Sequence, residues 1–278
     1  MENQLMVRYL NSKNIGSIMI VFALVTILIC MSDSANSQTA NRSKTQKQTM
    51  GKSSSAPESA NKAIAQAQQN GDYLYIMFYE KKDDSYQEMR KTVQAFVKKS
   101  VKPIKTYEAM TTDSKESDVI QKYGINQAPL PILLVFAPNG AITGGFPQKA
   151  TEKQLTDCMV PNLIMNILKT VQSGKIALIL LQNKNTTLNT EVENVAVEFS
   201  KDTRVAGYVD IIKQDPSEGN IKDFLTQCKV ENTSTEASTV MIVPPNKIGG
   251  VFKGKITKET LIAGLASCSG GSCCGSKK

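Results

Sequence analysis

Three cysteines lie within seven residues near the C-terminal end of the sequence: Cys268, Cys273 and Cys274. Glycine and serine separate them, so the backbone can fold back and bring several sulfur atoms together. Thiolates are soft ligands, and three of them could bind Cu(I) or another thiophilic metal. A closed Zn site would need a fourth ligand. Alternatively, Cys268 and Cys273 form a disulfide with Cys274 as its exchange partner, or the tail cysteines simply pair with each other or with another chain.

The composition excludes several mechanisms. The 278 residues include no histidine, so there is no Ser-His-Asp triad, no Cys-His pair and no imidazole metal ligand. The formal charge is +8, but the lysines are spread along the chain and accompany no nucleic-acid-binding motif. We therefore expect no nucleic-acid partner. Any acid–base or metal chemistry must use Cys, Asp, Glu, Lys or Tyr.

The first 37 residues have the layout of a targeting segment. Arg8 and Lys13 precede an apolar run over residues 15–31, and small residues at Ala35 and Ser37 are typical of a cleavage site. Residues 1–37 are therefore predicted to be a signal peptide or an N-terminal membrane anchor. An uncleaved run would tether the protein to a membrane. Either alternative predicts an exported protein, whether periplasmic, extracytoplasmic or secreted. Residues 38–59, rich in Ser, Thr, Lys and Gln, are expected to be a disordered linker.

The stretch around residues 125–155 predicts a sequence of elements. The apolar run Ile132 to Phe136 does not alternate, which is typical of a buried strand. Pro131 precedes it, Pro138-Asn139-Gly140 predicts a tight turn, and residues 141–146 can return as a hairpin. Thr151 and Gln154 have capping-box spacing, so a helix is expected to start there, with a break at Pro161.

This order resembles the C-terminal half of a thioredoxin domain, in which a cis-proline opens a central strand. Pro131 lies at the position of that proline. The upstream elements complete the resemblance and define a first domain over residues 60–172. They are helices at 60–69, 85–99 and 117–123, and strands at 73–79 and 101–107.

The Cys-x-x-Cys of redox-active thioredoxins is missing. Its place falls at about residues 83–86, where the chain has Asp-Asp-Ser-Tyr. Asp84 or Ser85 is expected to cap the following helix. A site for a cation or a peptide is the alternative interpretation.

A second copy of the pattern follows the first. Phe146, Lys149, Thr151 and Leu155 recur 106 residues later, at Phe252, Lys255, Thr257 and Leu261. The sequence therefore predicts a degenerate second domain over residues 173–267. Its strands are expected at 175–181, 205–212 and 239–243, and its helices at 188–200 and 221–228. In this copy Ala237-Ser238 replaces the proline, and residues 183–189, again without cysteine, occupy the place of the redox motif.

Two further cysteines lie inside the predicted domains. Cys158 is on a helix and Cys228 at a helix end. We interpret both as buried apolar residues, and a disulfide between them is the alternative in an oxidising compartment.

Together these patterns predict an α/β protein with two tandem thioredoxin-like domains, each a mixed sheet flanked by helices. A flexible Cys-rich tail over residues 268–278 follows. The leading hypothesis is a non-catalytic binding protein whose tail binds a soft metal, such as Cu(I) or Zn, or presents thiols to a protein partner. The alternative is a thiol–disulfide oxidoreductase that acts on a thiol or disulfide substrate through Cys268, Cys273 and Cys274. A third hypothesis is a structural or assembly role.

Overall fold

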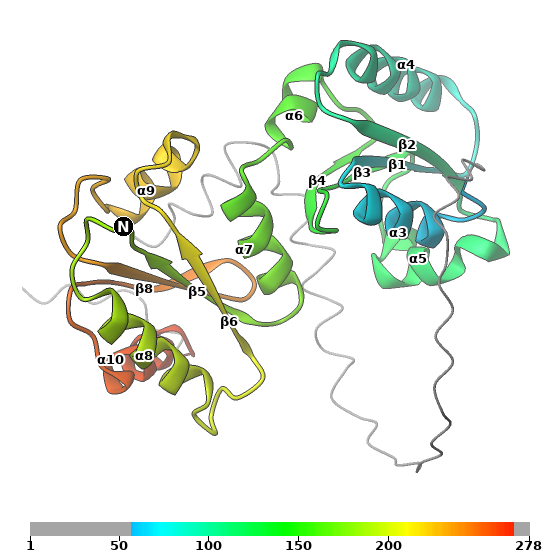
Figure 1. Cartoon of the computed structure of the whole chain (residues 1–278). Helices are drawn as coiled ribbons and strands as arrows, with labels where there is room; N and C mark the ends of the chain where they lie inside the picture. The colour runs from blue at the N-terminus through cyan, green and yellow to red at the C-terminus, as the bar shows by residue number, and fades with distance from the viewer. Residues whose placement is uncertain (1–56, 270–278) are drawn as a thin grey trace, which may run out of the picture.

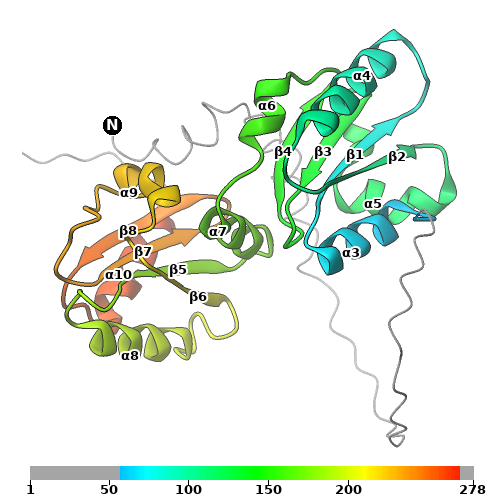
Figure 2. The same cartoon turned by 45° about the horizontal axis from the view of Figure 1, so that its top comes forward.

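The computed structural model describes residues 57–269. Their strands form two four-stranded mixed sheets that follow one another along the chain, and helices cover both faces of each sheet (Figures 1 and 2). The prediction of two tandem α/β domains is confirmed. None of the helices within these residues has the length and hydrophobicity needed to cross a membrane.

The first sheet has the strand order β2-β1-β3-β4. β1 pairs in parallel with β2 and antiparallel with β3, and β3 pairs antiparallel with β4. Every residue of β1 is buried, because α3 and α5 cover one face and α4 and α6 the other. The elements are α3 (Ala60–Asn70), β1 (Tyr73–Tyr79), α4 (Asp84–Lys99), β2 (Ile104–Met110), α5 (Ser117–Lys122), β3 (Ile132–Phe136), β4 (Ile142–Pro147) and α6 (Glu152–Asp157).

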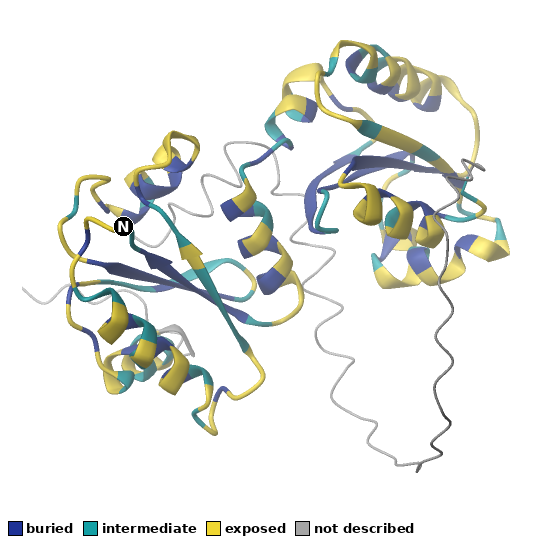
Figure 3. Cartoon of the chain, viewed as in Figure 1, coloured by how far each residue is buried: buried dark blue, intermediate teal, exposed yellow. Residues whose placement is uncertain are grey.

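The second sheet repeats this arrangement with the order β6-β5-β7-β8 and the same directions of pairing. α7 and α9 cover one face, and α8 and α10 the other. Figure 3 shows the buried strands between helices whose outer faces are exposed. The elements are α7 (Asn162–Gln172), β5 (Ile176–Leu181), α8 (Asn189–Ser200), β6 (Val209–Gln214), α9 (Lys222–Cys228), β7 (Ser238–Val243), β8 (Lys247–Lys253) and α10 (Lys258–Ser269).

Several local predictions are confirmed by specific contacts. Gly71 ends α3 in the left-handed conformation, with φ of 71°. Thr151 and Gln154 form the capping box of α6. The chain breaks before α7 at Pro161, as expected of a residue that cannot donate a helical hydrogen bond. The Leu130–Pro131 peptide bond is cis.

Two predicted strands begin too early. The strand expected at 101–107 starts at Ile104, since Lys102 N–H donates to Ser100 Oγ in a turn and Val101 is fully exposed. The strand expected at 205–212 starts at Val209. Val205 is buried, but its N–H donates to the Asp202 carbonyl, so this apolar residue fills the core from a turn.

The helix α7 changes the position of the domain boundary. The sequence places that boundary at residues 172–173, but α7 packs against β5, β6 and β7 and is the first helix of the second domain, as α3 is of the first. α7 also contacts β4 of the first sheet. Gln172 holds this contact by accepting from Ile142 N–H at 2.9 Å and donating to the Ile142 carbonyl at 2.7 Å. One hydrophobic cluster consequently runs through both domains.

Candidate functional site

The connection after β1, residues 80–83, lies where the sequence pattern places the missing dithiol. Asp83, one residue before the predicted cap, accepts a hydrogen bond from Tyr86 N–H at 3.0 Å and so caps α4. The Lys82 amino group lies 5.7 Å from the ring centroid of Tyr79 and 5.9 Å from that of Tyr86. A helix cap and two packed aromatic rings therefore occupy this position.

Tyr86 is a protonated hydrogen-bond donor at this place. Its ring is 2% exposed, and its hydroxyl donates to Glu108 Oε2 at 2.5 Å. Arg90 donates from Nε to the other carboxylate oxygen at 2.8 Å. Burial, followed by the bond to Glu108, raises the pKa of Tyr86 far above its ordinary value. Near neutral pH the phenol therefore keeps its proton and donates it in the hydrogen bond to Glu108.

The cis-proline Pro131 lies at the entrance to β3 and uses its carbonyl to accept from Gln148 N–H. Pro129 is exposed and Leu130 half-buried. Within residues 57–269, no backbone hydrogen bond joins Leu130 to the connection 80–83. The main chain at Leu130 is thus an accessible end of the central strand.

In the second domain, the main chain just before β7 is paired with the connection 182–188. Thr187 forms a parallel bridge with Glu236: Thr187 N–H donates to the Thr235 carbonyl at 2.8 Å, and Ala237 N–H donates to the Thr187 carbonyl at 3.1 Å. The connection 182–188 extends to the chain at Glu236 because it has seven residues, whereas the connection 80–83 has four.

Side chains fix that longer connection. Asn183 donates from Nδ2 to Asp215 Oδ1 at 2.8 Å, and its carbonyl accepts from Asn189 Nδ2 at 2.7 Å. The Thr186 hydroxyl accepts from Asn183 N–H at 2.9 Å. The loop is therefore held as a structural unit rather than left open.

Both thiols with described side chains are buried. Cys158 is 2% exposed and Cys228 is 3% exposed. Cys158 Sγ packs over Gly144, where a Cβ would lie only 2.3 Å from the sulfur. Burial raises the pKa of Cys228 to about 12. The interpretation of both as apolar core residues is confirmed.

The tail cysteines remain predictions. The backbone of Cys268 belongs to α10, which runs to Ser269, so the first two residues of the predicted flexible tail are helical. Cys273 and Cys274 lie outside the described residues. Among the described side chains, no group of three or more Cys, Asp or Glu residues is arranged to hold a metal ion.

Strand order, pairing directions and helix placement agree in both halves. The chain has two thioredoxin-like domains in tandem. No protein-family model matches the sequence, and no curated protein matches it either. Among solved structures it is similar to the first two thioredoxin domains of Eps1p from Naumovozyma dairenensis, with 12% identity over 74% of this chain and 94% of that chain, and a TM-score of 0.28.

The chain is also similar to two other solved structures. Human ERp44 is 13% identical over 78% of this chain and 56% of its own, with a TM-score of 0.33. The N-terminal domain of the alkylhydroperoxide reductase AhpF from Enterococcus faecalis is 14% identical over 73% of this chain and 98% of its own, with a TM-score of 0.26. The fold assignment itself rests on the topology of the two thioredoxin-like domains described above.

Sequence reasoning missed the Thr187–Glu236 bridge. A signal was present, because the spacing between the repeats changes within the chain. Gly71 corresponds to Gly174, at a spacing of 103, whereas Phe146 and Phe252 are 106 apart. Two of the three extra residues lie before α8, since α4 and α8 start 105 residues apart, and the third lies between β6 and β7.

Proposed function

We propose that this chain is an exported, non-catalytic thioredoxin-like binding protein whose tail cysteines, Cys268, Cys273 and Cys274, bind a soft metal or present thiols. The observation that carries the proposal is the burial of the thiols within the domains. Thiol–disulfide exchange needs an accessible thiolate. Burial raises the pKa of Cys228 to about 12, so its thiol stays protonated near neutral pH.

The unpaired main chain at Leu130, just before β3, is the binding surface that we assign to the first domain. Position 237 of the second domain supplies an N–H to Thr187, but Pro131 at the equivalent position has none. The N–H and carbonyl of Leu130 remain for pairing with an extended segment of another protein. In the second domain the equivalent main chain, at Glu236, is already bridged to Thr187. We therefore assign this domain a structural role that supports the first.

The decisive experiment compares residues 38–278 with a variant that carries Ser at positions 268, 273 and 274. This replacement keeps the length of α10, which a truncation at Ala266 would shorten. Both proteins are purified without oxygen, and bound metal and free thiols are measured by native mass spectrometry and thiol titration. We expect metal in the first protein only, with its tail thiols protected.

The same pair of proteins tests the alternative. An oxidoreductase acting through the tail would reduce the disulfides of insulin with turnover, and the Ser variant would lose this activity. Turnover without bound metal would replace our proposal by this alternative. If the two proteins differ in neither metal content nor thiol reactivity, the tail has no chemical role and that part of the proposal is wrong.

A further inference from the structure

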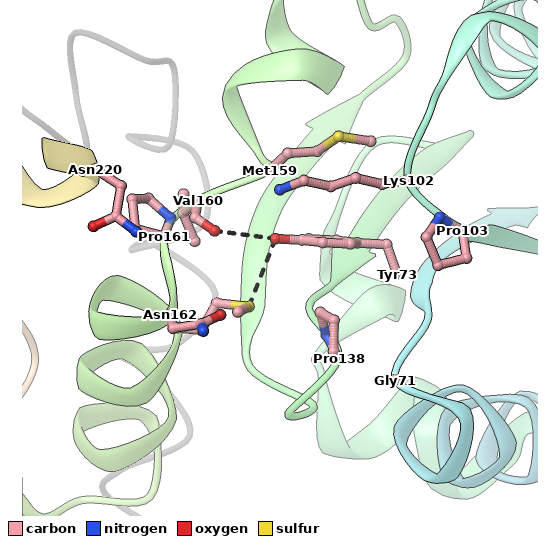
Figure 4. A pocket seen from close by; sticks show the side chains of 11 residues that line it. Gly71, Tyr73, Lys102, Pro103, Pro138, Met159, Val160, Pro161, Asn162 and Asn220 are labelled. Carbon is pink, nitrogen blue, oxygen red and sulfur yellow. Dashed lines mark hydrogen bonds between the residues drawn. The ribbon is translucent and has the colours of Figure 1, made fainter. Parts of the chain in front are cut away.

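A cleft of about 450 Å³ lies between the two domains, beside the linker that joins α6 to α7 (Figure 4). Gly71 before β1 and Tyr73 at its start, with Lys102 and Pro103 before β2, line one side. The linker, the first turn of α7 and Asn220 line the other. Its volume falls within the range of about 300–1,000 Å³ typical of small-molecule sites, which are frequent at domain interfaces.

Tyr73 forms a fixed wall of the cleft. Its side chain is held in place because the hydroxyl donates to the Val160 carbonyl at 3.2 Å and contacts Met165 Sδ at 3.6 Å. Figure 4 shows Lys102 lying alongside this ring. The Lys102 amino group is 5.6 Å from the ring centroid, a cation–π arrangement that holds the charge at the cleft.

Among residues 57–269, Lys102 and Tyr73 are the only ionisable side chains that line the cleft, so no described carboxylate lines it. No ion pair within these residues involves Lys102. Lys99 and Lys175, by contrast, pair with Glu152 and Asp210. The cleft thus carries one positive charge without a partner carboxylate, which favours an anionic ligand.

The remaining lining is mixed in character. Met159 and Met165 provide flexible apolar surface, and prolines add rigid apolar surface. Asn162 and Asn220 bring side-chain amides that can donate hydrogen bonds. A ligand that suits this lining has one anionic group for Lys102 and a short apolar body for the methionines.

The cleft is preformed by contacts outside it. Gln172 forms two hydrogen bonds with the backbone of Ile142, and Asn139 donates to Asn166 at 3.3 Å, so α7 is held against the first sheet. A preformed site requires less ordering of the protein when a ligand binds.

From these features we propose that the interdomain cleft binds a small carboxylate with a short apolar chain. This proposal does not depend on the tail cysteines or on the unpaired main chain at Leu130. Its failure would therefore leave the proposed function standing.

The test is a titration of residues 38–278, which contain both domains with their cores, using hexanoate as the probe. Methionine methyl groups are labelled with ¹³C and followed by NMR, because Met159 and Met165 report directly on the cleft. We expect saturable shifts of these two methyl signals. Hexanamide, which keeps the chain but lacks the charge, is expected to bind about tenfold more weakly.

Two lysine substitutions test whether Lys102 supplies the positive charge that binds hexanoate. Lys102→Gln should weaken hexanoate binding about tenfold, whereas Lys105→Gln, an exposed lysine of β2 outside the cleft, should leave it unchanged. Both side chains are exposed, and circular dichroism checks that each variant is folded. The proposal is wrong if the two methyl signals do not move, if hexanamide binds as tightly as hexanoate, or if Lys102→Gln binds as the parent does.

Discussion

The two domains share one topology but differ in the hydrogen bonding of the main chain just before the third strand of each sheet, β3 in the first and β7 in the second. In the first domain, the short connection 80–83 and Pro131 leave the main chain of Leu130 accessible. In the second, the connection 182–188 crosses to Glu236 and pairs with it through Thr187. A longer connection and the replacement of a proline by Ala237 thus convert an unpaired strand end into an internal contact. The comparison shows that the proline also decides which hydrogen bonds this end of the sheet can make.

The largest expected effect tests whether the domains are one folding unit. Leu155 and Leu261 occupy equivalent positions in the repeat, and both are 0% exposed. Leu155→Ala and Leu261→Ala should each lower the free energy of unfolding by about 2–5 kcal/mol, because each leaves a cavity. Urea denaturation followed by circular dichroism measures both.

Because one hydrophobic cluster runs through both domains, we expect a single transition that either substitution shifts. Two resolved transitions, each moved by only one substitution, would contradict this expectation. Val197→Ala is the control, since Val197 is 43% exposed and its truncation should change the free energy by less than about 0.5 kcal/mol.

A smaller effect concerns alkaline pH. Burial raises the pKa of Tyr73 to about 12, whereas Tyr208 of the second domain is 64% exposed. Between pH 10 and 12 the unfolded chain loses the Tyr73 proton first, so the stability present below pH 10 falls as pH rises. At pH 11 this loss is on the order of 1 kcal/mol for Tyr73.

Urea denaturation of the parent and of Tyr73→Phe at pH 8 and pH 11 isolates the Tyr73 contribution, because the other buried groups with raised pKa values are present in both proteins. Tyr73→Phe should reduce the difference between the two pH values, because the substituted side chain no longer titrates. Tyr208→Phe should leave the difference as it is. Equal pH dependence of the parent and Tyr73→Phe would mean that Tyr73 is not the buried, proton-retaining group described above.

The smallest effect tests the bridge itself. Ala237→Pro gives the second domain the residue type that the first has at position 131, and it removes the N–H that donates to the Thr187 carbonyl. The expected loss of stability is about 1 kcal/mol. Hydrogen exchange should show faster exchange of the Thr187 amide, while amides of β1 keep their protection. If the Thr187 amide exchanges as slowly as in the parent, the bridge does not depend on this bond.

Many elements were predictable from local chemistry. The buried run Ile132–Phe136, the capping box at Thr151 and the break at Pro161 each depend on residues close together in sequence. The starts of β2 and β6 were less predictable. Val101 and Val205 look like strand residues, yet one lies exposed in a turn and the other fills a core from a turn.

The sequence by itself determined the fold class, the tandem repeat and the absence of cysteines from both thioredoxin-type positions. These properties follow from hydrophobic patterns, capping residues and spacing, which act over short distances. Only the tertiary structure decided that α7 belongs to the second sheet, that Thr187 closes one strand end, and that Lys102 and Tyr73 meet the linker at a cleft. These features join residues far apart in the chain, and their energies exist only after the sheets have packed.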